Sequence, residues 1–104
     1  MAIKYATDEN YKELVSEGVV IVDFFTKTCV PCKMMTMVLE ELDDEFPFLN
    51  IVKVDCDECP KTSEEFEIMG IPDIYYYNEG EVLFHESGAV DADYIKEKLA
   101  NILY

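Results

Sequence analysis

Two adjoining segments, Gly18-Val-Val-Ile-Val-Asp-Phe-Phe-Thr26 and Cys29-Val30-Pro31-Cys32, carry the strongest structural signal in this chain. The first is a β-branched and aromatic run, apolar almost throughout, which predicts a strand buried on both faces of a sheet. The second segment is followed by residues 33–46, whose helix formers and helical spacing predict a helix. This order places Cys29 at the end of a buried strand and at the start of a helix.

That placement predicts an activated thiol. Unpaired N–H groups and the positive end of the helix dipole favour thiolate over thiol, so the pKa of Cys29 is expected to fall from ~8.5 towards ~7 or less. Cys32 follows one helical turn later and can close a disulfide. Pro31 suits a first helical turn because no donor is lost there. We therefore predict a nucleophile, Cys29, and a resolving thiol, Cys32.

Outward from these segments, hydrophobic periodicity predicts alternating strands and helices. The expected strands are 3–5, 18–26, 49–56, 74–77 and 81–85, and the expected helices are 7–17, 33–46, 60–69 and 93–103. Strands alternating with helices imply parallel pairing, to which the last two strands add an antiparallel hairpin. The expected fold is α/β, a central mixed sheet of about five strands flanked by four helices on both faces, in a single domain over residues 1–104.

Composition limits the partners. The 104 residues include 8 basic and 23 acidic side chains, a net charge of −15, and half of the residues are apolar. Such an acidic chain repels phosphate, so nucleic acid and anionic membranes are not expected as partners. No apolar run approaches the ~18 residues that a membrane-spanning helix needs. The N-terminus lacks the layout of a signal peptide, and the expected location is the cytoplasm.

Five blocks in order resemble the thioredoxin family. Val22-Asp-Phe-Phe-Thr-Lys-Thr-Cys-Val-Pro-Cys-Lys-Met34 is similar to the family's V-D-F-W-A-x-W-C-G-P-C-K-M, and Lys53-Val-Asp-Cys-Asp-Glu58 to its K-V-D-V-D-E. Gly70-Ile71-Pro72 matches its G-I-P, whose proline is cis and faces the cysteines. The remaining two blocks are the hairpin turn at 78–80 and the G-A loop at 88–89. The resemblance implies the thioredoxin fold.

The resemblance also implies an activity, a protein-disulfide oxidoreductase that works through a reversible Cys29–Cys32 disulfide. Asp23 would be a buried carboxylate that accepts the proton of Cys32, with Lys53 near it. No bound cofactor and no metal are implied. The expected partners are protein disulfide substrates and a thioredoxin-reductase-type electron donor, and the expected state is a monomer.

A substrate groove beside the cysteines is implied as well. Its expected residues are Thr28, Val30, Pro31, Ile71, Pro72, Gly88 and Ala89. A substrate strand would pair with the backbone of Ile71, an extended-peptide mode of recognition. The chain departs from the family pattern at Thr28, Val30 and Met37, which replace tryptophan, glycine and proline. It also departs at Asp73, which replaces threonine and is expected to add negative charge near the thiols.

A second pair, Cys56 and Cys59, is not part of the family pattern. Cys59 precedes Pro60 at a helix start, which predicts an exposed thiol of lowered pKa, and we expect the two to form a regulatory oxidisable pair. The alternative for Cys56 is a purely structural role, as a free thiol packed in the core. The spacing C-x2-C-x23-C-x2-C leaves open a zinc or iron–sulfur domain. A redox-inert binding adaptor is a further alternative.

Overall fold

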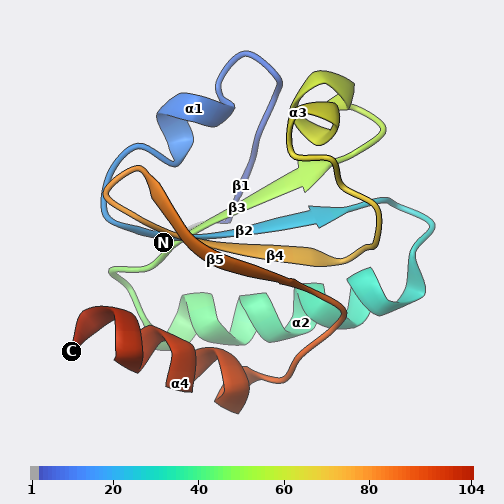
Figure 1. The fold of residues 1–104 in the computed structure, drawn as a ribbon. Coiled ribbons are helices and arrows are strands. Elements are labelled where there is room, and N and C mark those ends of the chain that lie inside the picture. Colours follow the sequence, from blue (N-terminus) through green and yellow to red (C-terminus); the bar gives the residue numbers. More distant parts are fainter. Residues whose placement is uncertain (1–2) are drawn as a thin grey trace.

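A computed structural model of the chain describes residues 3–104, and within them five strands form one sheet in the order β1-β3-β2-β4-β5 (Figure 1). The elements are β1 (Lys4–Tyr5), α1 (Tyr11–Leu14), β2 (Val19–Phe25), α2 (Val30–Glu45), β3 (Asn50–Asp55), α3 (Pro60–Glu65), β4 (Asp73–Asn78), β5 (Glu81–Ser87) and α4 (Ala92–Leu103). Strands β1, β3 and β2 are parallel, β4 runs antiparallel to β2, and β5 runs antiparallel to β4. The expected α/β fold is confirmed.

Helices cover both faces of the sheet, with α2 and α4 on one face and α1 and α3 on the other (Figure 1). All seven residues of β2 are buried, because the strand is central and both of its faces are covered. Successive side chains of a strand point to opposite faces. Ile21 accordingly belongs to the apolar cluster that includes Leu39 of α2, and Phe24 to the cluster that includes Tyr11 of α1.

Helix α2 is amphipathic and places one stripe in the core. Its buried residues are Cys32, Met35, Leu39 and Leu42, at intervals of three and four.

Within residues 3–104, no helix is both long and apolar enough to cross a membrane.

The two short helices differ from their expected extents. Helix α1 covers four residues rather than 7–17, because Thr7 and Asn10 hydrogen-bond to each other's backbone N–H, at 2.7 and 3.1 Å, and hold the preceding residues in a turn. Helix α3 ends at Glu65 rather than at 69. Glu67 adopts a left-handed φ of 52°, and the N–H groups of Glu67 and Ile68 bond to carbonyls one turn back, a helix end that usually carries glycine.

Candidate active site

The cysteine pair lies where β2 leads into α2. Cys29 is the N-cap of α2, and its Sγ accepts the backbone N–H of Cys32 at 3.2 Å. The two sulfurs form a disulfide whose Cα atoms are 5.2 Å apart, within the usual range. Cys32 is only 1% exposed, whereas Cys29 is half-buried. An approaching molecule therefore reaches Cys29 first, and the expected strand–cysteine–helix arrangement is confirmed.

Asp23 is a fully buried carboxylate on β2, on the strand that leads to Cys29. Neither of its side-chain oxygens has a hydrogen-bond partner among the described residues. Lys53, its neighbour in register on β3, holds its Nζ 3.6 Å from Asp23 Oδ2, an ion pair too long for a hydrogen bond. Desolvation raises the pKa of Asp23 from its ordinary 3.8 to about 6, although the charge of Lys53 opposes the rise.

Lys53 is buried as well, and its hydrogen bond goes to another residue. Its ammonium donates to the hydroxyl of Thr36 on α2 and lies 4.4 Å from the centre of the Phe25 ring. The Thr36 hydroxyl in turn donates to the backbone carbonyl of Cys32 at 3.1 Å. A continuous polar path thus runs from the Asp23 carboxylate to the backbone of Cys32.

Thr36 is the site residue that the sequence analysis missed. It stands four residues after Cys32, on the same face of α2, and that spacing is the only signal that could have found it. A small cavity of about 130 Å³ opens beside this path, and Cys32, Thr36 and Lys53 are among the residues that line it.

The expected groove residues lie on three segments of the chain, 28–31, 71–72 and 88–89. Asp73 pairs with Phe24 across β4 and β2, so Pro72 lies beside the end of β2 from which the cysteines follow. The bond between Ile71 and Pro72 is cis. The N–H of Gly88 donates to the carbonyl of Pro72 at 2.8 Å, which fastens the 88–89 loop to the proline.

The expected groove residues differ in how far they are exposed to solvent. Pro72 is buried and Ile71 and Gly88 are half-buried, while the other four are exposed, namely Thr28, Val30, Pro31 and Ala89. Exposed side chains next to a half-buried sulfur leave that sulfur open to a polypeptide.

Asp73 points away from this groove. Side chains alternate along β4, and Tyr75 belongs to the cluster on the α1 and α3 face, so Asp73 lies on that face too. One Asp73 carboxylate oxygen is 3.0 Å from Nδ1 of His85, and the His85 ring stacks on Tyr75 with centres 4.4 Å apart. The Asp73 charge thus has its own partner on the opposite side of the sheet from α2.

The expectation of an exposed Cys59 with a lowered pKa is wrong. Cys59 is 1% exposed, and its thiol donates to the carbonyl of Ala6 at 3.3 Å. Burial, and then the carboxylates of Asp8 and Asp55, raise its pKa. The cause is the docking of α3 on the segment before α1, where Asp8 accepts the backbone N–H of Thr62 at 2.8 Å.

Cys56 is half-buried, and burial also raises the pKa of its thiol. Cys56 and Cys59 are both free cysteines. The regulatory role of this pair stays a prediction. Over residues 3–104, no group of three or more histidine, cysteine or acidic side chains is arranged to hold a metal ion.

Comparison with known proteins agrees with this geometry. The thioredoxin family model matches residues 2–101. The thioredoxin of Bacillus subtilis strain 168 is 46% identical over 84 residues, which cover 80% of this chain and 81% of that protein. The thioredoxin of Staphylococcus haemolyticus is 40% identical over 104 residues, covering 99% and 96%. That of Chlamydia trachomatis serovar D is 35% identical over 91 residues, covering 88% and 89%.

The match extends over nearly the whole chain, and it agrees with a disulfide found where a buried strand meets a helix. This chain therefore belongs to the thioredoxin family and is a thiol–disulfide oxidoreductase.

Proposed function

We propose that Cys29 is the nucleophile that reduces protein disulfides and that Cys32 is the thiol that releases the product. The observation that carries this assignment is the unequal exposure of the two sulfurs, since Cys29 is half-buried and Cys32 is 1% exposed. The N–H of Cys32 points at the Cys29 sulfur from the first turn of α2. A thiolate at Cys29 is favoured by that donor and by the helix dipole.

The reaction passes two electrons from the protein to the substrate. The Cys29 thiolate attacks one sulfur of a substrate disulfide, forms a mixed disulfide and releases the other substrate sulfur as a thiolate. Cys32 then loses its proton and attacks the Cys29 sulfur. This second step forms the Cys29–Cys32 disulfide and expels the reduced substrate.

Asp23 is the proposed acceptor of the Cys32 proton. Its burial and its missing hydrogen bonds support this role, because both disfavour the ionised carboxylate. A carboxylate of pKa about 6 is closer to a thiol in proton affinity than an ordinary carboxylate is. Lys53, 3.6 Å away, limits the rise and keeps Asp23 ionisable near neutral pH.

The proposed substrate site is the groove around Pro72. An extended substrate segment pairs with the backbone of Ile71, as added strands do elsewhere. Its walls are formed by Thr28, Val30, Pro31, Gly88 and Ala89. The exposure of most of these residues next to Cys29 supports the proposal.

Family members act on protein disulfides and receive electrons from a reductase. For this chain we propose a thioredoxin-reductase-type donor, no bound cofactor, and a monomeric single domain over residues 1–104 working in the cytoplasm. A reducing compartment suits a protein whose dithiol must be regenerated.

Replacing each active cysteine tests the division of roles. Cys29→Ser should abolish reduction of insulin-type disulfides, because the attacking thiolate is gone. Cys32→Ser should accumulate mixed disulfides on Cys29, which mass spectrometry of the intact protein detects. Cys56→Ser is the control for removal of a thiol and should retain activity. A substrate adduct on Cys32 in the Cys29→Ser protein would reverse the assignment.

A further inference from the structure

One exposed face of α2 is apolar where charge would be expected. Val30, Met34 and Met37 are 66%, 61% and 71% exposed, and Val38 beside them is half-buried. Their spacing of three and four residues places them on one side of the helix. This stripe begins inside the cysteine motif, and contiguous exposed apolar surface of this kind marks interaction sites.

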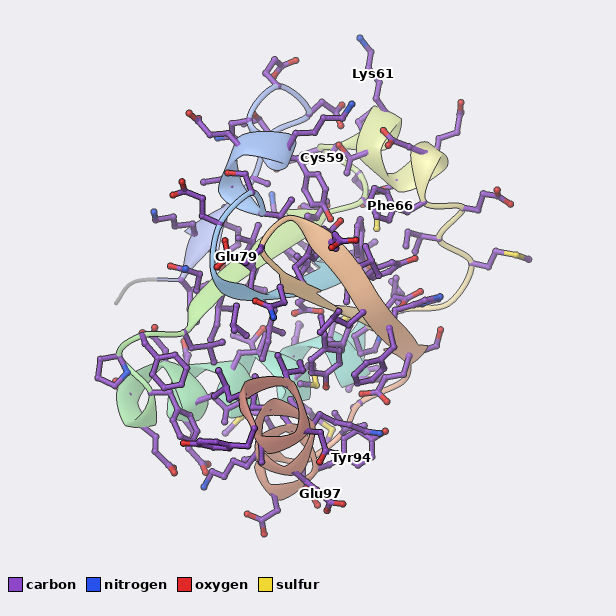
Figure 2. The ribbon with its side chains drawn as sticks, turned by 60° about the vertical axis from the view of Figure 1, so that its left-hand side comes forward. Cys59, Lys61, Phe66, Glu79, Tyr94 and Glu97 are labelled. Atoms are coloured by element: carbon purple, nitrogen blue, oxygen red, sulfur yellow. A yellow bond between two sulfur atoms is a disulfide. The ribbon has the colours of Figure 1, made fainter. Side chains whose placement is uncertain are left out.

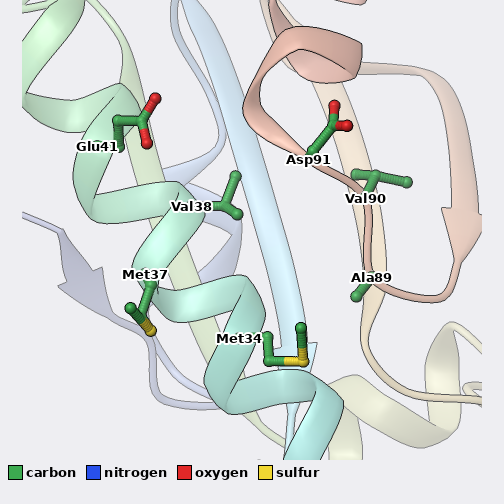
Figure 3. Close-up of a pocket in the computed structure, with 7 residues that line it drawn as sticks. All are labelled: Met34, Met37, Val38, Glu41, Ala89, Val90 and Asp91. Atoms are coloured by element: carbon green, nitrogen blue, oxygen red, sulfur yellow. The ribbon is translucent and has the colours of Figure 1, made fainter.

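Met34, Met37 and Val38 of this stripe, together with Glu41, form one wall of a groove, and Val30 lies before its near end. Ala89, Val90 and Asp91, between β5 and α4, form the other wall, and the cavity between them measures about 520 Å³. Figure 3 shows Met34 and Val38 on α2 across from Ala89 and Asp91. The helix rises about 1.5 Å per residue, so the eleven steps from Val30 to Glu41 span about 16 Å.

The charged groups of the groove are all acidic. Glu41 and Asp91 are the charged side chains among the described residues that line it. Asp91 is fixed in place because its carboxylate accepts the N–H of Tyr94 at 2.9 Å and caps α4. Lys96 forms an ion pair with Glu45, with its Nζ 2.8 Å from Glu45 Oε1. The Glu41 carboxylate adds a smaller contribution to the raised pKa of Lys96. The far end of the groove is therefore suited to a cation.

We propose that this groove is a substrate subsite, which accepts an apolar side chain of the disulfide-bearing polypeptide and, near Glu41 and Asp91, a lysine or arginine. The inference rests on the proposed attack by Cys29. Ala89 belongs both to the proposed groove around Pro72 and to this one, so a polypeptide bound at Cys29 continues into it. About 16 Å corresponds to about five residues of extended chain.

Two further features favour a substrate as the occupant. Methionine side chains adapt to differently shaped apolar groups, which suits a protein that reduces several substrates. A second copy of the chain is disfavoured, because two chains of net charge −15 would bring two acidic rims together.

The charge preference is tested with peptides whose single cysteine carries a chromogenic thionitrobenzoate disulfide. Each has leucines between the cysteine and a terminal lysine or glutamate five residues away, in both chain directions. We expect kcat/KM to favour the lysine peptide about threefold, the size of an exposed ion pair, and Glu41→Lys to invert the preference. Glu40→Lys, which changes an exposed neighbour outside the lining and gives the same net charge, should keep the wild-type ratio.

The apolar half is tested with Met37→Gln, which keeps the length of the side chain. It should raise KM for the leucine peptides about fivefold at unchanged kcat, since only part of a side chain is buried. Peptides with glycine in place of leucine should not respond. A small disulfide without side chains should be reduced equally by every variant, which also shows that each variant is folded.

Three results would overturn the subsite. The first is a ratio of kcat/KM for lysine and glutamate peptides that is the same in the wild-type protein and in every variant. The second is an effect of Met37→Gln that leucine and glycine peptides share. The third is a concentration-dependent dimer that Met37→Gln dissociates, which would assign the face to a second copy. Failure of the wild-type protein to reduce even the small disulfide would instead overturn the proposed attack by Cys29.

Discussion

Burial of the Asp23 carboxylate costs the folded protein free energy, because the ionised group is removed from water. A buried carboxylate without hydrogen bonds is unfavourable, and within residues 3–104 the ion pair with Lys53 at 3.6 Å is what compensates for it at Asp23. A site chosen for stability alone would carry an uncharged residue there. A carboxylate at this position suits a base that stays desolvated until it accepts the proton of Cys32.

Asp23→Asn should therefore stabilise the oxidised protein in a pH-dependent way. The folded-state pKa of Asp23 is raised, to about 6 from 3.8, so the parent loses stability as the pH rises between these values and no further above them. Asparagine cannot ionise. The difference in unfolding free energy, variant minus parent, should grow by about 3 kcal/mol between pH 3.5 and 7.5, as measured by denaturant unfolding.

The same variant should turn over more slowly at pH 7, because Cys32 loses its proton acceptor. Asp44→Asn, on an exposed part of α2, controls for the loss of one negative charge. A stability difference that stays constant with pH would mean that Asp23 is solvated and is not the proton acceptor.

Thr36 competes with Asp23 for Lys53. In Thr36→Val the ammonium loses its hydroxyl acceptor, and we expect it to close on the Asp23 carboxylate and lower the pKa of Asp23. The pH midpoint of the Asp23 carboxyl shift, followed by NMR, should fall, and the acidic limb of the activity profile should move with it. Thr36→Ser keeps the hydroxyl and should keep the parent profile. An unchanged midpoint in Thr36→Val would show that Thr36 does not govern Lys53.

At the level of elements, the strands and the long helices were predictable, whereas the extents of the two short helices, α1 and α3, were not. The buried strand β2 and the buried face of helix α2 follow from composition and spacing, because each element buries many residues in one periodic pattern. The expected placement of Cys29 at the start of α2 and of Pro31 in its first turn is confirmed, although the periodic pattern itself begins only at residue 33. Helix α3 ended early at a left-handed Glu67, where the sequence offers no glycine to announce the end.

The side chains of α3 show why burial was harder to foresee than chain direction. Phe66 lies just after the helix (Figure 2). Its ring packs on those of Tyr11, Phe24 and Tyr75, with ring centres 5.2 to 5.5 Å apart. These contacts hold α3 against the sheet and bury Cys59 beneath its first turn. The contacts of Phe66 with Tyr11 and Phe24 join residues 55 and 42 positions apart, and no local pattern encodes them.

The turn from β3 into α3 carries the last thiol prediction. In graded peroxide, the Cys29–Cys32 pair should oxidise first, and Cys56 and Cys59 only later, because burial raises both of their pKa values and leaves little thiolate. Thiol counting by mass spectrometry should show two phases. The double variant Cys56→Ser, Cys59→Ser should lose the slow phase but retain reduction of insulin-type disulfides.

Direct evidence against this regulatory pair would be simple to obtain. If Cys29 and Cys32 are the only cysteines that ever join within one molecule, Cys56 and Cys59 are packing residues and have no redox role.

Across the whole molecule, acidic charge is in large excess. Twenty-three carboxylates and eight lysines occupy a chain whose radius of gyration is 12.4 Å, comparable to the Debye length of about 10 Å at 0.1 M salt. Some of the lysines are used in pairs, such as Lys27 with Glu58 at 2.6 Å and Lys96 with Glu45 at 2.8 Å. The rest of the excess repels itself in the folded state and attracts basic partners.

Salt should therefore stabilise this protein near neutral pH. Raising NaCl from about 0.02 to 0.5 M shortens the Debye length from about 20 Å to about 4 Å, which screens the repulsion among the surface carboxylates and should raise the unfolding free energy. The buried Lys53–Asp23 pair is shielded from the salt. Near pH 4 many carboxylates are protonated, so the same salt series should there have a much smaller effect. An equal response at pH 4 and pH 7 would trace the effect to salt-induced changes in hydration, because repulsion among carboxylates must weaken as they gain protons.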